Sequence, residues 1–302
     1  RNALWQKELE LVVSKAAGPG SLDPLYELEG IDLPIGEVRW TQKRNLEEFL
    51  RLLQIKKVNV QPLITHRFPI TDSEKSFSVE DGYEIQNKVI GRRLKDGETI
   101  IGVKAGLTSM AKQQAMGVNE PVYGVITNKM LLKSGEKADL SRFIHPRVEP
   151  EIVFTLSHDL SGDNLTIDDV IDATESICCG LEIIDSRYRD FRFTLADVVA
   201  DNTSAAAFVL GEKQVSPDFD LALTGCLLEV DGDVAATATG AAVLDHPANA
   251  VALLSKWLHK QGKGLKKGWT ILSGGLTNAY PLNPGTTIKG NFAHLGSVSV
   301  QS

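Results

Sequence analysis

Two glutamates, Glu149 and Glu151, lie one residue apart in the apolar segment HPRVEPEIVF, which spans residues 145–154. The segment is typical of a β-strand, so both carboxylates would point to the same face of the strand, about 6 to 7 Å apart. Two carboxylates this close repel each other, and burying them without a partner costs several kcal/mol. Either one carboxyl group keeps a proton or a cation lies between the two.

A third acid, Glu182, has an apolar neighbour on each side, Leu181 and Ile183. Three carboxylates with no histidine or cysteine close in sequence suit a hard cation such as Mg²⁺ or Mn²⁺, because these ions prefer oxygen ligands. Glu149, Glu151 and Glu182 are therefore a candidate metal site. In the alternative interpretation, the acids face solvent on amphipathic strands, and their spacing alone does not separate the two possibilities.

The elements that would position these acids follow from the hydrophobic periodicity. Apolar, strand-forming segments and one Asp-Gly turn predict strands over 98–109, 144–156, 177–188 and 224–240. Amphipathic patterns with capping residues predict three helices. The first starts near Ser78, the second lies in 165–177 with Thr166 or Asp168 as its N-cap, and the third lies in 246–262. Strands dominate and no βαβ pattern recurs. We therefore expect an α+β fold with a curled mixed β-sheet and few flanking helices.

The composition of the 302 residues, 42% hydrophobic and 24% charged, allows one large domain or two moderate ones. A net charge of -7 gives no electrostatic reason to expect nucleic acid or an anionic membrane as a partner. No apolar stretch reaches the roughly 18 residues of a membrane span, and no signal peptide opens the chain. These features predict a cytoplasmic protein. Because the chain begins with Arg1, we also expect an N-terminus trimmed or cut from something longer.

The cysteines Cys178, Cys179 and Cys226 show neither CxxC spacing nor a disulfide framework. Two of them are adjacent and cannot easily pair with each other. We expect buried thiols in a reducing compartment.

Residues 1–77 differ from the rest of the chain. Alternation over 4–15 predicts a strand, and 45–57 is predicted as a helix with Asn45 as its N-cap. The segments GPGSLDPLYELEGIDLPIGEVRWTQKRN and VNVQPLITHRFPITDSEKSF resemble the C-terminal tail of zinc-type medium-chain dehydrogenases. The sequence has no G-x-G-x-x-G turn after a strand to hold a dinucleotide. We therefore expect an N-terminal segment without a cofactor site, followed by a catalytic domain over 78–302.

Eight segments of residues 78–302 carry a second resemblance, and they occur in the order IGVKAGLTS, MGVNEPVYGVI, HPRVEPEIVF, LEIIDSRY, VVADNTS, GAAVLDHPANAVALL, LSGGLT and LGSVSV. Together they resemble the fumarylacetoacetate-hydrolase superfamily, in the branch of the 2-keto-4-pentenoate hydratases and the 4-oxalocrotonate decarboxylases. That family binds its metal with an E-x-E pair and a later glutamate. Glu149, Glu151 and Glu182 match this pattern, so the resemblance implies an Mg²⁺ or Mn²⁺ cofactor.

The resemblance also implies a lysine that faces the site, and Lys104 matches it. Its ammonium would pair with a substrate carboxylate or hand protons to the carbon chain. Asp185 could orient Lys104 or a water molecule, and Arg187 could hold a distal carboxylate or make a surface ion pair. His145 could support the metal ligands or act as a general acid.

A Gly-rich turn, SGGLT, supplies the remaining predicted contacts. Its N–H groups and a hydroxyl could receive the C1 carboxylate of the substrate, with Ser273, Gly274, Gly275 and Thr277 as the contact residues. A simple tight turn is the alternative. Asp201 and Asn202 are expected to hold a loop together.

The activity implied by the resemblance is metal-dependent decarboxylation of 2-oxo-3-hexenedioate (4-oxalocrotonate) to 2-hydroxypenta-2,4-dienoate in aromatic meta-cleavage catabolism. IHP before the E-x-E pair and DSRYRDFRF favour this lyase over its alternative, 2-keto-4-pentenoate hydratase. The superfamily's C–C hydrolases and a non-enzymatic fusion or scaffold protein are further alternatives. The implied partners are a small 2-oxo dicarboxylate, further copies of the chain in a homo-oligomer, and the partner hydratase or decarboxylase.

Overall fold

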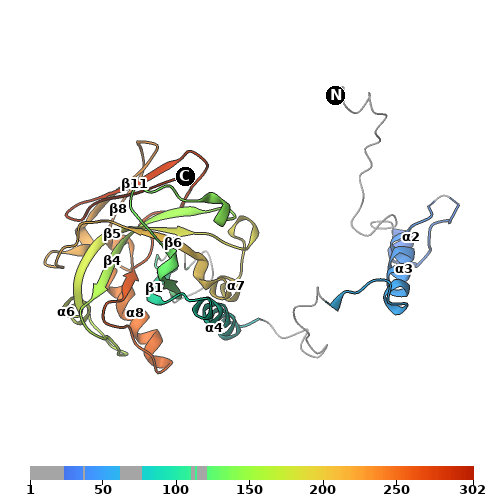
Figure 1. Cartoon of the computed structure of the whole chain (residues 1–302), viewed down its shortest axis with the longest axis horizontal. Helices are drawn as coiled ribbons and strands as arrows, with labels where there is room; N and C mark the ends of the chain where they lie inside the picture. The colour runs from blue at the N-terminus through green and yellow to red at the C-terminus, as the bar shows by residue number, and fades with distance from the viewer. Residues whose placement is uncertain (1–23, 37, 62–76, 110–112, 114–120) are drawn as a thin grey trace. The chain divides into compact units, whose positions relative to one another are not determined.

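The computed structural model describes residues 24–36, 38–61, 77–109, 113 and 121–302. The chain divides into two units, Arg1–Lys75 and Ser76–Ser302 (Figure 1). The described residues of the first unit form the helices α2 (Pro24–Glu27) and α3 (Gln42–Gln54). The strand predicted over 4–15 lies outside the described residues.

Helix α3 begins earlier than predicted. Its N-cap is Thr41, not Asn45, because the Thr41 side chain accepts a hydrogen bond from the backbone N–H of Arg44 at 3.4 Å. The Arg44 guanidinium also forms an ion pair with Asp32 at 3.1 Å. This pair ties the segment before α3 to the first turn of the helix.

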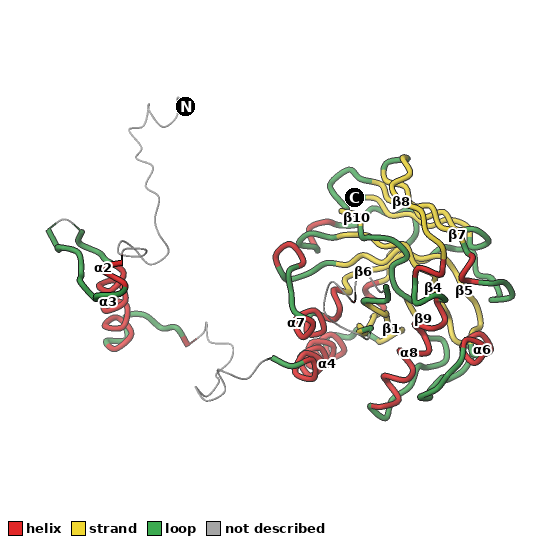
Figure 2. Tube along the Cα trace, turned by 180° about the vertical axis from the view of Figure 1, so that it is seen from behind, coloured by secondary structure: helices red, strands yellow, loops and turns green. Residues whose placement is uncertain are grey.

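In the described part of the second unit, eight strands form a strongly curled sheet in the order β2-β1-β9-β4-β5-β6-β3, and β10 pairs with β4 (Figure 2). The sheet is mixed, since β1–β9 and β3–β6 are parallel and the other pairs are antiparallel. Its strands are β1 (Ile100–Gly106), β2 (Val122–Thr127), β3 (Leu131–Leu132), β4 (Arg147–Leu156), β5 (Thr174–Ile184), β6 (Ala205–Leu210), β9 (Thr270–Leu272) and β10 (Tyr280–Pro281). The predicted α+β class with a curled mixed sheet is confirmed.

A smaller antiparallel sheet has the order β12-β11-β7-β8. Its strands are β7 (Gly225–Val230), β8 (Asp233–Thr239), β11 (Thr287–Phe292) and β12 (Gly296–Gln301). The predicted hairpin at Asp231-Gly232 joins β7 to β8. Both turn residues have positive φ angles, 53° and 91°, as this tight turn requires.

Four helices of the second unit are α4 (Val79–Lys95), α6 (Ile167–Asp172), α7 (Leu195–Ala200) and α8 (Pro247–Lys260). Ser78 caps α4 in a capping box with Asp81, and Thr166 caps α6 in the same way. Helix α6 is shorter than the predicted 165–177, because the chain turns into β5 at Thr174. The apolar residues after that turn pair with β4 instead of completing a helix.

The two faces of the large sheet are buried in different ways. On one face, side chains of β4 and β5 such as Val148, Ile152 and Leu181 join the main core with the smaller sheet and α8. On the opposite face, Val153 packs with a smaller cluster made by Ile126, Met130, Cys178, Phe208 and Leu272. Because alternate strand residues share a face, the three glutamates lie on the side of this smaller cluster.

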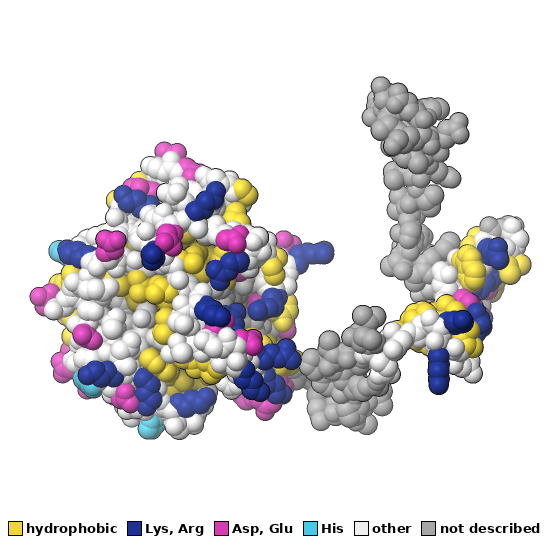
Figure 3. All heavy atoms as spheres, in the orientation of Figure 1, with side chains coloured by type: hydrophobic (Ala, Val, Ile, Leu, Met, Phe, Trp, Pro, Cys, Tyr) yellow, Lys and Arg dark blue, Asp and Glu magenta, His cyan; other side chains and the backbone are white. Residues whose placement is uncertain are grey.

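The surface carries no one-sided charge in the view of Figure 3, where basic and acidic side chains are interspersed over the second unit. The three cysteines are buried free thiols, as predicted. Within the described ranges, no helix combines the length and the apolar character that a membrane crossing requires.

Gly102 tests the packing of β1 against β9. A Cβ atom at this position would lie 1.8 Å from the carbonyl oxygen of Thr270, its partner in the parallel register. We expect Gly102→Ala to lower the free energy of unfolding by about 2 kcal/mol or more, because β1 must move away from β9. Urea unfolding followed by circular dichroism measures the change.

Gly91→Ala is the matched control, because Gly91 lies in α4 and a Cβ there meets nothing within 4 Å. It should leave the stability unchanged or raise it by up to about 1 kcal/mol. Equal effects of the two substitutions would contradict the close contact between β1 and β9.

Candidate active site

The pairing of β4 with β5 brings the three glutamates together. Glu149 lies directly opposite Glu182, and Glu151 follows two residues along on the same face. One carboxylate oxygen of each residue lies within 4.8 Å of the other two. The exposed fractions of Glu149, Glu151 and Glu182 are 7%, 0% and 1%, so the alternative in which these acids face solvent is wrong.

Burial dominates the electrostatics of the carboxyl groups. It raises the pKa of Glu151 well above its usual range, and the negative charge of Glu182 raises it further. Burial also raises the pKa of Glu182, against the opposing charge of Lys104. The protein therefore holds these acids at a free-energy cost that a positive charge in their midst would relieve.

Lys104, on β1, supplies part of that charge. Its ammonium lies 2.8 Å from Oε2 of Glu182 and donates a hydrogen bond to the carbonyl oxygen of Thr203 at 3.1 Å. Burial alone would lower the pKa of Lys104, but the three glutamates outweigh it and raise the pKa. The side chain is buried, so the lysine faces the acids and not solvent.

The Gly-rich turn after β9 lies against the same acids. The N–H of Gly274 donates a hydrogen bond to Oε2 of Glu151 at 2.8 Å. A Cβ atom on Gly275 would lie 2.2 Å from Oε2 of Glu149, so only glycine leaves room for that carboxylate. Gly274 has a φ of 113°, which also favours glycine.

The two hydroxyl groups of the turn have backbone partners. Ser273 donates to the carbonyl oxygen of Ile152 at 2.7 Å, and Thr277 donates to that of Asn278 at 2.8 Å. Ser273 therefore fastens the turn to β4. Contact of these residues with a substrate stays a prediction.

Asp185 binds the backbone of the segment that precedes β4. Its two oxygens accept hydrogen bonds from the N–H groups of Ile144 and His145, both at 2.8 Å. The His145 ring stacks on Phe191, with 4.7 Å between the centroids, and its buried Nε2 has no hydrogen-bond partner among the described residues. The structure thus places Asp185, which directly follows β5, against His145 in the segment that leads into β4 and its glutamates.

Arg187 lies beside a different carboxylate. Its guanidinium pairs with Asp201, and its backbone N–H donates to the same side chain at 3.0 Å. The Arg187 side chain is 60% exposed. The structure therefore brings Arg187 to Asp201 and does not show it among the glutamates.

Residues 202–204 form a turn that supports Lys104, and part of it was not anticipated from the sequence. Asn202, Thr203 and Ser204 all have positive φ angles, between 54° and 56°. The Asn202 side chain exchanges two hydrogen bonds with the backbone of Val125, at 2.8 and 2.9 Å, which confirms its expected role in holding a loop. The contact from Thr203 to Lys104 uses a backbone carbonyl, so no residue type in the sequence signals it.

The donor set fits a hard divalent cation. Oε1 of Glu151 and Oε1 of Glu182 are buried and have no hydrogen-bond partner among the described residues. Three carboxylates and one ammonium leave an excess of negative charge in a buried place. Oxygen-only ligands of this kind are those that Mg²⁺ and Mn²⁺ prefer.

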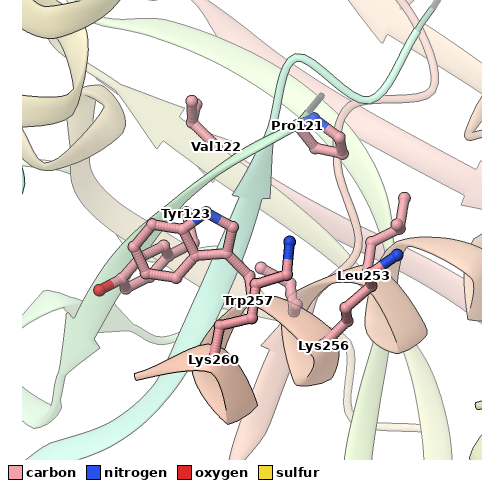
Figure 4. Close-up of a pocket in the computed structure, with 8 residues that line it drawn as sticks. Pro121, Val122, Tyr123, Leu253, Lys256, Trp257 and Lys260 are labelled. Carbon is pink, nitrogen blue, oxygen red and sulfur yellow. The ribbon is translucent and has the colours of Figure 1, made fainter. Parts of the chain in front are cut away.

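A small cavity of about 40 Å³ lies elsewhere in the second unit, between β2 and α8. Tyr123 and Trp257 form part of its wall, with Lys256 and Lys260 beside them (Figure 4). The predicted site residues do not line this cavity.

No protein-family model matches the chain. Similar curated proteins exist in two enzyme groups. The 4-oxalocrotonate decarboxylase of Pseudomonas sp. (strain CF600) is 37% identical over 241 residues, which are 79% of this chain and 91% of the relative. The 2-hydroxypent-2,4-dienoate hydratase of Pseudomonas putida is 43% identical over 192 residues, 63% of this chain and 86% of the relative.

Solved structures show the same relationship. The 4-oxalocrotonate decarboxylase from Pseudomonas putida G7, complexed with magnesium and adipate, has a TM-score of 0.74 and 35% identity over 84% of this chain and 97% of that chain. The fumarylpyruvate hydrolase from Pseudomonas aeruginosa, at 17% identity and a TM-score of 0.53 over 66% of this chain and 87% of that chain, shares the fold. This chain therefore belongs to the family of lyases that includes the 4-oxalocrotonate decarboxylases and the 2-keto-4-pentenoate hydratases, and it shares its fold with fumarylacetoacetate hydrolase.

Proposed function

We propose that this protein is a metal-dependent decarboxylase that converts 2-oxo-3-hexenedioate to 2-hydroxypenta-2,4-dienoate in aromatic meta-cleavage catabolism. The observation that carries the proposal is the buried cluster of Glu149, Glu151 and Glu182 beside the ammonium of Lys104. Three curated decarboxylases at 36–38% identity support it, as does the solved decarboxylase whose adipate is a saturated six-carbon dicarboxylate.

Glu149, Glu151 and Glu182 would hold the metal ion, Mg²⁺ or Mn²⁺. When bound there, the ion supplies a Lewis acid for the C1 carboxylate and C2 carbonyl oxygens of a 2-oxo acid. The protein's own groups set the site for it, since the Gly274 N–H orients Glu151 and the absence of a side chain at Gly275 leaves Glu149 in place.

The proposed substrate is a vinylogous β-keto acid. When the C5–C6 bond breaks, C6 leaves as CO₂ and the electron pair forms a C4–C5 double bond. The former C3–C4 double bond shifts to C2–C3, and the negative charge moves to the C2 oxygen. Among the described site residues, Lys104 is the cation that lies beside the acids. Its ammonium can therefore stabilise the negative charge on the C2 oxygen and donate the proton that gives the 2-hydroxy product.

Hydration of 2-hydroxypenta-2,4-dienoate is the second candidate, favoured by the 43% identity to a hydratase. It uses the same dienolate but protonates C5 and then adds water at C4. The two reactions differ in what the site must accept, because the decarboxylase substrate carries a second carboxylate. Release of CO₂ separates them.

The remaining assignments follow from this function. We place the activity in residues 78–302, because every residue of the predicted site lies there, and we give residues 1–77 no part in it. We propose a cytoplasmic homo-oligomer that associates with the enzyme catalysing the adjacent step. Size-exclusion chromatography with light scattering tests the assembly.

The assay of the wild-type protein is the direct test of the proposed reaction. With Mg²⁺ present, 2-oxo-3-hexenedioate should release CO₂ faster than it does spontaneously, and EDTA should abolish the difference because the carboxylates then lack their cation. CO₂ is measured by a coupled assay, and water addition to 2-hydroxypenta-2,4-dienoate is followed in parallel by loss of absorbance. Hydration without CO₂ release would replace the decarboxylase assignment with the hydratase.

Glu182→Gln tests the metal ligand directly. The substitution keeps the size of the side chain but removes a charge that both the cation and Lys104 need, so CO₂ release should fall at least about a hundredfold. Titration calorimetry should show weaker Mg²⁺ binding. Glu175→Gln, an exposed position of the same strand, is the control and should keep both properties. Unchanged Mg²⁺ affinity in Glu182→Gln would reject this glutamate as a ligand.

Gly275→Ala tests the space beside Glu149. The added methyl group would displace the end of the Glu149 side chain, which is flexible, so the fold should persist while Mg²⁺ affinity falls about tenfold or more. Thermal unfolding and Mg²⁺ titration measure the two effects. Gly225→Ala is the matched control, because a Cβ there meets nothing within 4 Å. Wild-type Mg²⁺ affinity in Gly275→Ala would show that Glu149 does not need this space.

A further inference from the structure

Arg147 lies on the same face of the sheet as the glutamates. It is the first residue of β4, it pairs with Ile184 of β5, and Glu149 pairs with Glu182 two residues further in the same regular register. Alternate strand residues share a face, so the Arg147 side chain leaves the sheet on the side of the acids. Two residues of strand span about 6 to 7 Å. The terminal carbons of an extended six-carbon diacid are about 6 Å apart by ordinary bond lengths.

The guanidinium of Arg147 lies against an aromatic ring, and no described residue provides it with a hydrogen-bond acceptor. It lies 4.5 Å from the centroid of Phe191, the ring on which His145 also stacks. Among the described residues, Arg147 is only partly exposed and has neither an ion pair nor a side-chain hydrogen bond. The ring contact stabilises and orients the cation. Its rigid fork of donors thus stays available for a planar anion.

The other candidate cations are already paired. The Arg187 guanidinium pairs with Asp201, and the Lys104 ammonium lies against Glu182. A substrate with two carboxylates brings its second negative charge close to three glutamates. That charge is repelled, and costly to bury, unless a cation accompanies it.

We propose that Arg147 binds the distal carboxylate of a dicarboxylic 2-oxo acid, and that it is the residue that selects dicarboxylates over monocarboxylates. The inference rests on the proposed function, since it assigns the second carboxylate of that substrate class to a residue of the same site. It moves the role that the sequence suggested for Arg187 to a guanidinium on the metal-binding strand.

Two stable 2-oxo acids of equal chain length test the proposal. 2-Oxohexanedioate and 2-oxohexanoate share the 2-oxo acid end and differ at C6, which is a carboxylate in one and a methyl group in the other. Titration calorimetry on the Mg²⁺-loaded wild type should show at least about tenfold tighter binding of the diacid, as charge-assisted hydrogen bonds provide. In Arg147→Gln this preference should fall to about twofold or less, with the monoacid affinity unchanged.

Three further variants sharpen the result. Arg147→Lys should keep part of the preference, because it retains the charge without the fork. Arg187→Gln and the exposed Arg142→Gln should keep all of it. The monoacid affinity reports whether each variant is folded and holds its metal.

The inference is overturned if Arg147→Gln keeps the preference for the diacid, if Arg187→Gln loses it, or if the wild type binds both acids equally. In those cases Mg²⁺-dependent binding and CO₂ release remain, so the proposed function stands. Failure of the proposed function looks different. Neither 2-oxo acid would then bind in the presence of Mg²⁺, and this result would reject both proposals.

Discussion

The ion pair between Lys104 and Glu182 is the interaction on which the site depends. Three carboxylates within 4.8 Å of one another, all buried, repel strongly in a medium of low dielectric constant. The buried ammonium offsets one of their charges, and its hydrogen bond to Thr203 fixes its position. Two negative charges remain in excess, which equals the charge of one divalent cation. This charge balance supports the divalent metal ion proposed for the site.

The fold brings these groups together from segments that are distant in the chain. The acids come from two long paired strands, the lysine from a third strand, and their supports from the turns at 202–204 and 273–277. One face of the sheet is closed by the main core, and the other by the smaller cluster around Phe208. Because the acids and the lysine lie on strands packed on both sides, their side chains have little freedom to relax away from one another.

Sequence reasoning located the acids, the strands and the hairpin, because alternation and the E-x-E spacing are local signals. It could not show that Glu149 and Glu182 are direct partners, since the pairing of β4 with β5 depends on the whole sheet. The end of α6 was predicted too late, because the residues that follow it form β5. The N-cap of α3 was predicted at Asn45, because the sequence did not show that Thr41 caps the helix. The two roles that the sequence left open for Arg187 could not be separated at that stage, because only the folded chain reveals that Asp201 pairs with Arg187.

The register of β4 against β5 has a consequence for folding. Side chains alternate along a strand, so a slip of β4 by one residue would turn Glu149 and Glu151 into the main core and place Val148 and Ile152 beside Glu182 and Lys104. Such an alignment would bury two charges far from Lys104, so it is strongly disfavoured. The glutamates that form the site therefore also favour the native alignment of β4 with β5 over a shifted one.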